Sequence, residues 1–273
     1  MTGGNTKKKT AECPKNKDIT MKHGDFTALA DNYASYRPGY APLIADMFVR
    51  LSGVPNPRCV DAGAGTGIWS RQLAAAGASV DAVEPNDAMR EAGQKQNGDL
   101  PVRWFKGSAE ATGLEEGVFD LACMASSFHW PNFDAAVREF ARLLKPGGYF
   151  MALWNTRRYE SNPLLMEIEN HLRSLAPTMK RVSSGRSEFC NGLTERLSSR
   201  TEFVDVVYLE GRHTERQTPQ HYLGLWESVN DVRVQLGEER FARFLDYIRE
   251  KTANLPFIDA EYLTRAWVAR RAG

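Results

Sequence analysis

The chain has 273 residues, 42% of them hydrophobic, and a formal net charge of +1 at pH 7. This length and apolar content suffice for one α/β domain with additions, and a second domain is not required. The near-neutral charge provides no long-range field, so we expect neither nucleic acid nor a membrane surface as a partner. Four scattered cysteines without a CxxC pair argue against a metal site or a disulfide framework and favour a cytoplasmic location.

The first 22 residues are rich in lysine, threonine, glycine and asparagine and carry almost no large apolar side chain. Such a composition does not bury enough apolar surface to fold, and it contains no apolar run that resembles a signal or a membrane span. We therefore expect a disordered tail over residues 1–22 and a folded domain over residues 23–273.

Two short helices are predicted next, over residues 26–33 and 41–51, with the break Arg37-Pro38-Gly39 between them. The second helix carries an apolar stripe, which we expect to face the core. Its members are Leu43, Ile44, Met47, Phe48 and Leu51.

The most informative segment is residues 59–67, where an apolar strand breaks into a glycine-rich turn and a helix begins at Ile68. Glycine adopts positive φ and has no Cβ, so a ligand can lie against bare backbone beside the positive end of the helix. A dinucleotide fingerprint needs a third glycine three residues after Gly65, but Ile68 occupies that position. The turn therefore argues against a pyrophosphate ligand.

A second strand, residues 79–84, ends in Glu84 about 20 residues after the glycine turn, the separation at which such folds reach ribose hydroxyls. A carboxylate at this position would accept both hydroxyls of a ribose diol. The alternative is that the turn and the acid bind nothing, as in other α/β folds.

Strands and helices then alternate, which predicts a Rossmann-like α/β fold: a doubly wound, mostly parallel sheet with helices on both faces. The ligand of such a sheet lies at the carboxyl ends of the strands. The strands are expected at residues 58–62, 79–84, 102–106, 119–124 and 149–154, with a helix at residues 133–144.

The carboxyl-terminal half is expected to form a helical lid insert around residues 155–200, with further helices around residues 218–253. A helix is predicted at Pro163–Leu175 and a strand at residues 203–209. One of the two arginines after the fifth strand, Arg157 or Arg158, is expected to face the pocket.

Four segments of the amino-terminal half carry a family resemblance: residues 61–67 (DAGAGTG), 83–86 (VEPN) with Met89, 107–110 (GSAE) and 144–148 (LKPGG). In this order and spacing they resemble the class I S-adenosylmethionine-dependent methyltransferases, over about residues 26–154. The segment Phe128-His129-Trp130 and the helical carboxyl-terminal half are most similar to the small-molecule group that includes trans-aconitate and ubiquinone-pathway enzymes. The resemblance also implies a final antiparallel strand near residues 263–269.

S-adenosylmethionine is the cofactor that this resemblance implies, with its methionyl part on Asp61 and the glycine turn, its ribose on Glu84 and its adenine beside Asn86 and Met89. An amino-terminal segment over the cofactor would bring Arg37 to the methionyl carboxylate, since a guanidinium pairs bidentately with that group. The alternative is that Arg37 is a surface charge and Tyr36 a packing residue. The implied cofactor-binding residues are Tyr36, Arg37, Asp61, Gly63, Ala64, Gly65, Thr66, Gly67, Glu84, Pro85, Asn86, Met89, Ser108, Ala109, Glu110 and Ser126.

A sulfonium methyl group is already activated, so positioning and exclusion of water supply most of the rate. His129, just beyond the fourth strand, is the candidate general base, and Asn155, after the fifth strand, is the candidate for orienting the acceptor. The alternative for His129 is a pocket wall. Residues 126–129 (SSFH) lack the Pro-Pro-aromatic motif of DNA amino-methylating enzymes, which favours a small-molecule acceptor, with carboxylate-bearing ones among the candidates.

Two other functions stay open from the sequence. The first is an NAD(P)-dependent oxidoreductase on the same sheet, against which Ile68 argues. The second is a protein that binds S-adenosylmethionine without transferring its methyl group, either cyclising the aminobutyrate portion or acting as a non-catalytic partner. The sequence contains no indication of the oligomeric state.

Overall fold

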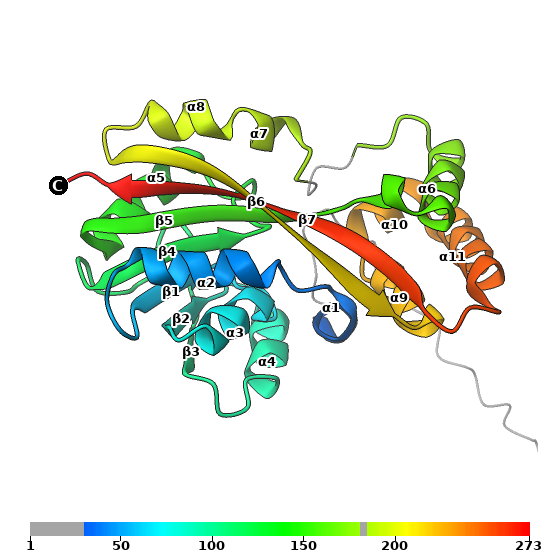
Figure 1. The fold of residues 1–273 in the computed structure, drawn as a ribbon, viewed down its shortest axis with the longest axis horizontal. Coiled ribbons are helices and arrows are strands. Elements are labelled where there is room, and N and C mark those ends of the chain that lie inside the picture. Colours follow the sequence, from blue (N-terminus) through cyan, green and yellow to red (C-terminus); the bar gives the residue numbers. More distant parts are fainter. Residues whose placement is uncertain (1–29, 181–184) are drawn as a thin grey trace, which may run out of the picture.

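The computed structural model describes residues 30–180 and 185–273, so the expected tail and the start of the first predicted helix lie outside the described residues. Within them, seven strands form one sheet in the order β3-β2-β1-β4-β5-β7-β6 (Figure 1). Strands β1 to β5 run parallel to one another, and β7 is antiparallel to both of its neighbours, β5 and β6. The predicted Rossmann-like sheet with a final antiparallel strand is confirmed. The strands are β1 Arg58–Ala62, β2 Ser79–Val83, β3 Val102–Phe105, β4 Phe119–Ala125, β5 Leu144–Arg157, β6 Phe203–Gln217 and β7 Ile258–Arg271.

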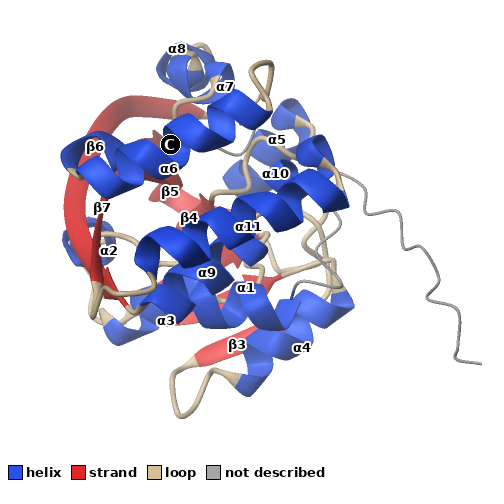
Figure 2. Cartoon of the chain, turned by 90° about the vertical axis from the view of Figure 1, so that its right-hand side faces the viewer, coloured by secondary structure: helices blue, strands red, loops and turns tan. Residues whose placement is uncertain are grey.

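Helices cover both faces of the sheet, and a further group of helices gathers at one end of the long strands β5, β6 and β7 (Figures 1 and 2). No described helix has the length and apolar character needed to cross a membrane. The helices are α1 Ala30–Tyr36, α2 Pro42–Leu51, α3 Ile68–Ala75, α4 Asp87–Lys95, α5 Phe133–Leu143, α6 Pro163–Leu175, α7 Glu188–Asn191, α8 Leu193–Ser198, α9 Pro219–Glu227, α10 Asn230–Leu236 and α11 Glu238–Thr252, with a short 3-10 turn at Tyr159–Ser161.

Three large apolar cores, and a small one between α1 and α4, hold the described layers together. One lies between the sheet and α5, α7 and α8, and a second lies on the opposite face under α2 and α3. The third joins α6, α9, α10 and α11 to the first residues of β7, Ile258, Ala260 and Tyr262. The helical group at the strand ends therefore has its own core and is attached to the sheet by continuous strands.

Helix α5 follows its sequence pattern closely. The Asn132 side chain accepts a hydrogen bond from the Ala135 N–H at 3.0 Å, which satisfies one of the free donors of the first turn. The face that packs on the sheet consists of Ala136, Val137, Phe140 and Leu143. The core-facing stripe that the helical spacing predicted is confirmed there.

The predicted apolar stripe of α2 is partly wrong. Ile44 and Phe48 are buried, but Leu43 is 59% exposed and Met47 and Leu51 are each 38% exposed. The edge strand β6 sets this orientation, because a Cβ on Gly211 would lie 2.8 Å from Ala41. The close approach of β6 directs the helix face of Ala41 and Ile44 to the sheet and the opposite face to solvent.

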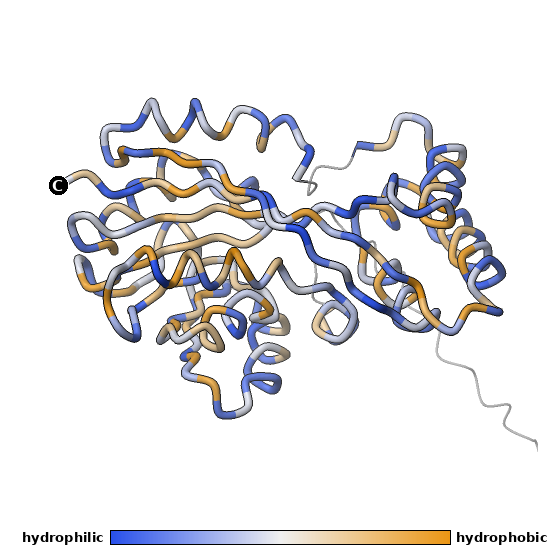
Figure 3. Tube along the Cα trace, viewed as in Figure 1, coloured by the Kyte–Doolittle hydropathy of each residue, from blue (hydrophilic) through white to orange (hydrophobic). Residues whose placement is uncertain are grey.

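Strand β6 is longer than the sequence predicted, since it pairs with β7 from Phe203 to Gln217 rather than ending near Leu209. Its second half is hydrophilic, as Figure 3 shows where the strand approaches α9. An antiparallel strand with one face in solvent can carry polar side chains on that face and still form its backbone hydrogen bonds. The low hydropathy of this segment therefore concealed the full length of β6. The short helices α7, α8 and α10 lie in the regions expected to be helical, but their bounds were not predicted, because they span only 4, 6 and 7 residues.

Candidate functional site

The glycine turn after β1 has the backbone that its sequence requires. Gly63, Gly65 and Gly67 have φ values of +65°, +57° and +75°, which disfavour any side chain. The N–H groups of Gly63 and Ala64 donate to the Val83 carbonyl at 2.8 and 3.1 Å, so the turn is fastened to the end of β2. The turn therefore presents bare backbone at the carboxyl edge of the sheet, directly before α3.

Glu84 lies against this turn and is only 7% exposed. One carboxylate oxygen accepts the Gly65 N–H at 2.9 Å, and the other accepts the Asn86 N–H at 2.8 Å. Burial raises the pKa of Glu84, and these two backbone hydrogen bonds act in the opposite direction. Glu84 therefore joins the glycine turn to the start of α4, a link that sequence reasoning did not find. Each oxygen keeps a further lone pair for a ligand.

Asp61, the last acid of β1, is fully buried. Its carboxylate accepts the Ser70 hydroxyl at 2.6 Å, and the Cys123 thiol lies 3.8 Å away. Burial raises the pKa of Asp61 to about 7, although the hydrogen bond from Ser70 opposes the shift. Asp61 therefore takes up a proton more readily than an exposed aspartate, a property that the sequence did not indicate.

The start of α4 brings Asn86 and Met89 to the same edge. The Asn86 side chain caps the helix by accepting the Met89 N–H at 3.1 Å. Met89 is 4% exposed, and its methyl carbon would lie 3.5 Å from a Cβ on Gly65. Pro85, between Glu84 and Asn86, is exposed.

Residues 108–110 form a turn after β3. Ser108 and Ala111 exchange backbone hydrogen bonds of 3.2 Å, and Ala109 is buried. The Glu110 carboxylate accepts the Asn132 N–H at 3.0 Å. Glu110 therefore connects the loop after β3 to the first turn of α5, and its role in the structure is a link between two loops of the ligand edge.

Ser126 follows β4 with a φ of +55°, an unusual value for a residue other than glycine. Its N–H donates to the Leu153 carbonyl at 2.7 Å, and its hydroxyl accepts the Tyr40 hydroxyl at 2.9 Å. Tyr40 is buried against Trp69, and burial raises the pKa of its phenol, which stays neutral. The link between Tyr40 and Ser126 brings the loop after α1 to the end of β4, and the sequence did not predict it.

His129 lies in an aromatic environment, with ring centres 4.5 Å from Trp130 and 6.2 Å from Trp154. Both ring nitrogens are buried and have no hydrogen-bond partner among the described residues. Burial lowers the pKa of His129 to about 4, and the charge of Asp231 only partly offsets this effect. The imidazole is therefore neutral at physiological pH and has a free acceptor nitrogen.

Asn155 fastens the loop that precedes α2. Its amide nitrogen donates to the Gly39 carbonyl at 2.7 Å, and its oxygen accepts the Thr264 hydroxyl at 3.3 Å. Thr264 in turn accepts the Ala41 N–H at 2.8 Å. Asn155 lies two residues past Leu153, whose carbonyl accepts the Ser126 N–H. Asn155 and Ser126 therefore both bind the loop between α1 and α2, Asn155 through Gly39 and Ser126 through Tyr40.

Tyr36 and Arg37 are directed toward α9. The Tyr36 ring packs edge-on against His221 at 5.3 Å. The Arg37 guanidinium donates to the Ser228 carbonyl at 3.0 Å and lies 4.8 Å from the ring centre of Tyr33, while its buried Nε has no hydrogen-bond partner among the described residues. The structure thus brings Glu84, Asn86 and Met89 to the glycine turn, and places Tyr36 and Arg37 between the sheet edge and the helical group.

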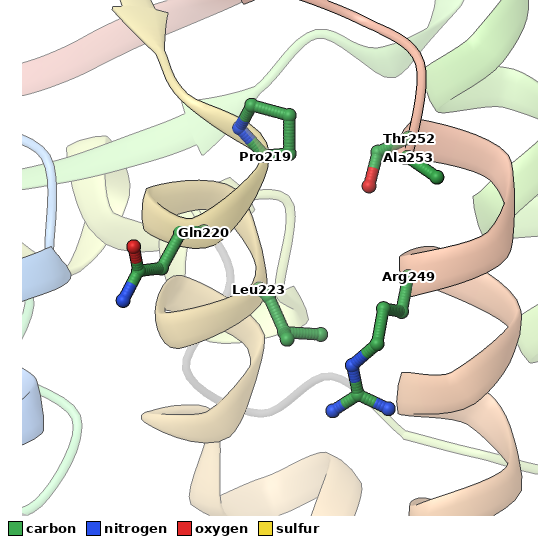
Figure 4. A pocket seen from close by; sticks show the side chains of 6 residues that line it. All are labelled: Pro219, Gln220, Leu223, Arg249, Thr252 and Ala253. Atoms are coloured by element: carbon green, nitrogen blue, oxygen red, sulfur yellow. The ribbon is translucent and has the colours of Figure 1, made fainter.

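Two hollows lie elsewhere on the molecule. A pocket of about 280 Å³ lies between α9 and α11 (Figure 4). It is lined by Pro219, Gln220, Leu223, Arg249, Thr252 and Ala253. A wider one of about 590 Å³ lies at the amino ends of β1, β2 and β3, opposite to the edge where sheets of this kind bind ligands. Neither hollow is lined by a predicted site residue. The candidate site is instead the edge of the sheet where the hydrogen-bonded glycine turn and the unpaired polar groups lie.

Comparison with known proteins agrees with this geometry. A family model described as a methyltransferase domain matches residues 60–152. An uncharacterized methyltransferase of Schizosaccharomyces pombe is 32% identical over 249 residues, which cover 90% of this chain and 96% of the relative.

Other relatives match a shorter part. An uncharacterized methyltransferase of Mycobacterium tuberculosis is 32% identical over 142 residues, which are 52% of this chain and 55% of the relative, so the chain spans about half the length of that relative. A ubiquinone/menaquinone biosynthesis C-methyltransferase of Rubrivivax gelatinosus is 35% identical over 108 residues, 39% of this chain and 43% of the relative.

Among solved structures, one described as a type II methyltransferase from Anaeromyxobacter dehalogenans superposes with a TM-score of 0.63. It is 21% identical and covers 87% of this chain and 98% of its own, which shows a common fold. Together with the nearly full-length match to the fission-yeast relative and the glycine turn at the edge of the sheet, these findings assign the chain: it belongs to the class I S-adenosylmethionine-dependent methyltransferase family.

Proposed function

We propose that the protein transfers the methyl group of S-adenosylmethionine to a small-molecule acceptor, with carboxylate-bearing molecules among the candidates. The observation that carries the proposal is the position of Glu84, whose buried carboxylate is held against the backbone of Gly65 at 2.9 Å. A ribose diol on the free lone pairs of Glu84 would lie directly over the glycine turn.

Unpaired polar groups around the turn fit a bound cofactor. The hydroxyls of Thr66 and Ser127 are buried and have no hydrogen-bond partner among the described residues. The Ser127 hydroxyl would lie 3.0 Å from a Cβ on Gly63, so it borders the turn itself. Buried hydroxyls are normally hydrogen-bonded, and a polar ligand on the turn would satisfy both.

The proposed residue roles follow their positions. Asp61 and the turn (Gly63, Ala64, Gly65, Thr66 and Gly67) would hold the methionyl part and Glu84 the ribose. Pro85, Asn86 and Met89 would flank the adenine, with Ser108, Ala109 and Glu110 at its border. Arg37, whose Nε has no hydrogen-bond partner in the described part of the chain, would pair with the methionyl carboxylate, and Tyr36 would close that end of the site.

When bound, S-adenosylmethionine would supply a sulfonium-activated methyl group, whose carbon an acceptor atom would attack in line with S-adenosylhomocysteine as the leaving group. Ser126 lies at the end of β4 beside this position, held by Tyr40. His129 would accept a proton from the acceptor, because its ring is neutral and both nitrogens are free of partners among the described residues. Asn155 would act by fixing the loop that carries Tyr40.

Of the lid insert expected around residues 155–200, helix α6 packs with α9, α10 and α11, and this helical group is proposed as the lid over the acceptor. Helices α7 and α8 of the same insert pack on the sheet instead. It meets the sheet edge through Arg37, which donates to Ser228 at the end of α9. The Rubrivivax gelatinosus relative is named for ubiquinone and menaquinone biosynthesis, and this name supports a small-molecule acceptor over a macromolecule.

Calorimetry with S-adenosylhomocysteine and with NAD is the first test. We expect binding of S-adenosylhomocysteine and none of NAD, since Ile68 replaces the third glycine of the dinucleotide turn. Tight NAD binding without an adenosylhomocysteine signal would replace the proposal by an oxidoreductase.

Incubation with methyl-labelled cofactor and a metabolite extract is the second test. Labelled small molecules and adenosylhomocysteine are the expected products, whereas methylthioadenosine would indicate cyclisation of the aminobutyrate portion. The variant His129→Ala should lower label transfer by roughly 10²- to 10⁴-fold while leaving adenosylhomocysteine binding intact. The matched control is His171→Ala, because His171 stacks on Tyr247 at 3.8 Å in the helical group, away from this edge.

A further inference from the structure

Arg157, the last residue of β5, has a partly buried side chain whose guanidinium forms no ion pair with a described carboxylate. Its central carbon lies 4.4 Å from the ring centre of Trp226 and 5.6 Å from that of Tyr222, both on α9. Its Nε is buried without a hydrogen-bond partner, and no described carboxylate forms an ion pair with the side chain. Burial acts to lower the pKa of Arg157, but nearby Tyr262, Tyr222 and Glu169 outweigh it and the pKa is raised, so the group stays a cation.

The neighbouring strands place two more polar side chains beside it. Arg157 pairs with Tyr262 on β7, and Tyr262 pairs with His213 on β6, so the three side chains form a row on one face of the sheet. The His213 ring stacks on Tyr262 with centres 5.4 Å apart. The Tyr262 hydroxyl and both His213 nitrogens are buried and have no hydrogen bond of regular geometry among the described residues, although the hydroxyl lies near Arg157 and the Gly39 backbone lies near His213. The nearest Glu215 oxygen, at 3.7 Å, is too far for a hydrogen bond to His213.

A guanidinium that loses hydration without forming an ion pair is unfavourable, and the charge of nearby Glu169 reduces that cost without forming such a pair. Stacking on Trp226 offsets only part of that cost. The row therefore contains one fixed positive charge, a hydroxyl donor and an imidazole whose pKa burial lowers. Since a single charge is present, the row matches a carboxylate better than a doubly charged phosphate, and a guanidinium fork fits the two oxygens of a carboxylate.

We propose that Arg157, Tyr262 and His213 form the subsite that binds a carboxylate of the methyl acceptor. The proposal rests on the proposed methyltransferase function and names the substrate class of the same site. Arg157 lies four residues past Leu153, whose carbonyl accepts the Ser126 N–H, which is roughly 13 Å along the strand. The bound carboxylate therefore anchors the part of the acceptor that is remote from the methylated atom.

Arg158 provides a matched control. It follows Arg157 directly, so its side chain leaves the strand on the opposite side. It forms an ion pair with Glu261 at 2.8 Å and is therefore already neutralised. The two substitutions Arg157→Gln and Arg158→Gln remove the same charge from adjacent positions, one without a counter-ion and one with it.

The test is calorimetry on the full chain saturated with S-adenosylhomocysteine, titrated with unbranched mono- and dicarboxylates of four to ten carbons and with their neutral amides. We expect at least one carboxylate to bind and its amide not to. Arg157→Gln should weaken that affinity by roughly ten- to a hundredfold, the scale of a lost charge-assisted hydrogen bond, and Arg157→Lys should restore part of it. Arg158→Gln should leave the affinity unchanged.

Several outcomes would overturn the subsite. These are equal losses in Arg157→Gln and Arg158→Gln, amides that bind as well as carboxylates, inorganic phosphate that binds in preference to every carboxylate, or no carboxylate binding at all. Adenosylhomocysteine binding is measured in the same samples, so a failure of the proposed function appears separately as loss of that signal in the unaltered chain. Thermal melts of Arg157→Gln and Arg157→Lys establish that both variants are folded. If neither substitution changes the carboxylate affinity, Arg157 has only a packing role.

Discussion

The carboxylate of Glu84 accepts the backbone N–H of Gly65 across 2.9 Å and so ties the end of β2 to the turn that follows β1. Its second oxygen holds the Asn86 N–H at the start of α4. A single buried side chain thus fixes the relative position of the glycine turn and of the helix that is proposed to flank the adenine. Loss of this carboxylate affects the shape of the site as well as its contact with a ribose.

We expect Glu84→Ala and Glu84→Gln each to weaken S-adenosylhomocysteine binding by about 1.5–3 kcal/mol, as for hydrogen bonds to a charged group. The amide of Gln keeps one acceptor oxygen and places its N–H₂ group opposite the second of the two backbone N–H groups that Glu84 accepts, so it does not substitute for the acid. Calorimetry measures the change, with Asp87→Asn as the control, because Asp87 is exposed and pairs with Arg90 and Lys106. If Glu84→Ala binds S-adenosylhomocysteine with unchanged affinity, Glu84 is not part of the cofactor site.

Asp61 predicts a pH dependence of stability. Burial raises its pKa from 3.8 to about 7, so between these values the folded chain binds a proton that the unfolded chain does not. Stability from this group is complete below about pH 4 and is lost as pH rises toward 7, up to about 4 kcal/mol in all. Urea denaturation of the unaltered chain and of Asp61→Asn at pH 5 and pH 7.5 measures it. The difference in unfolding free energy between the two proteins should favour Asp61→Asn more at the higher pH.

Ser70→Ala provides an internal check on that prediction. The Ser70 hydroxyl donates to Asp61 at 2.6 Å and lowers its pKa. Without this donor the pKa of Asp61 rises further, and the loss of stability should move to higher pH. Parallel pH curves for the unaltered chain, Asp61→Asn and Ser70→Ala would show that Asp61 does not titrate in this range.

The parts of the fold that depend on local pattern could be predicted from the sequence. The strands from β1 to β4, helix α5 and helix α6 were expected at nearly their observed bounds, because each has an apolar pattern bounded by turn residues. Strand β5, expected at residues 149–154, is longer and runs from Leu144 to Arg157. The orientation of α2 could not be predicted, since it depends on Gly211, which is far away in the sequence.

The site divides in the same way. Glu84 was expected beside the glycine turn because parallel strands end at one edge of the sheet. The contact between Tyr40 and Ser126 joins residues 86 positions apart and leaves no periodic pattern. For Arg157 and Arg158, alternation in a strand indicates opposite directions, but only the packing of α9 determines that Arg157 is the buried one.

Replacing Gly93 by alanine should destabilise the protein, although helix propensity alone would predict that it stabilises the protein. Alanine is favoured over glycine in a helix interior, but a Cβ on Gly93 of α4 would lie 2.3 Å from the Trp104 ring. The same ring would be 2.7 Å from a Cβ on Gly67, so Trp104 packs between α4 and the glycine turn. Gly93→Ala should therefore lower the unfolding free energy by about 1–3 kcal/mol.

Chemical denaturation measures this loss, and two further variants define its cause. Gly192→Ala is the control, because the nearest atom to its added Cβ is 3.9 Å away. The double variant Gly93→Ala with Trp104→Leu should recover part of the loss, since the smaller side chain leaves room. A double variant whose loss equals the sum of the two single losses would show that Trp104 is not the source of the clash.

Arg37 distinguishes a ligand role from a structural one. Its guanidinium donates to Ser228, yet its buried Nε has no partner among the described residues. If Arg37 pairs with the methionyl carboxylate, Arg37→Gln should weaken S-adenosylhomocysteine binding by about 1.5–3 kcal/mol and leave adenosine binding almost unchanged, because adenosine lacks that carboxylate. Arg50→Gln, on the exposed face of α2, is the control for loss of a positive charge. Equal weakening of both ligands in Arg37→Gln would instead mean that Arg37 acts by holding α9 through Ser228, since a misplaced helix would affect the whole site rather than one carboxylate.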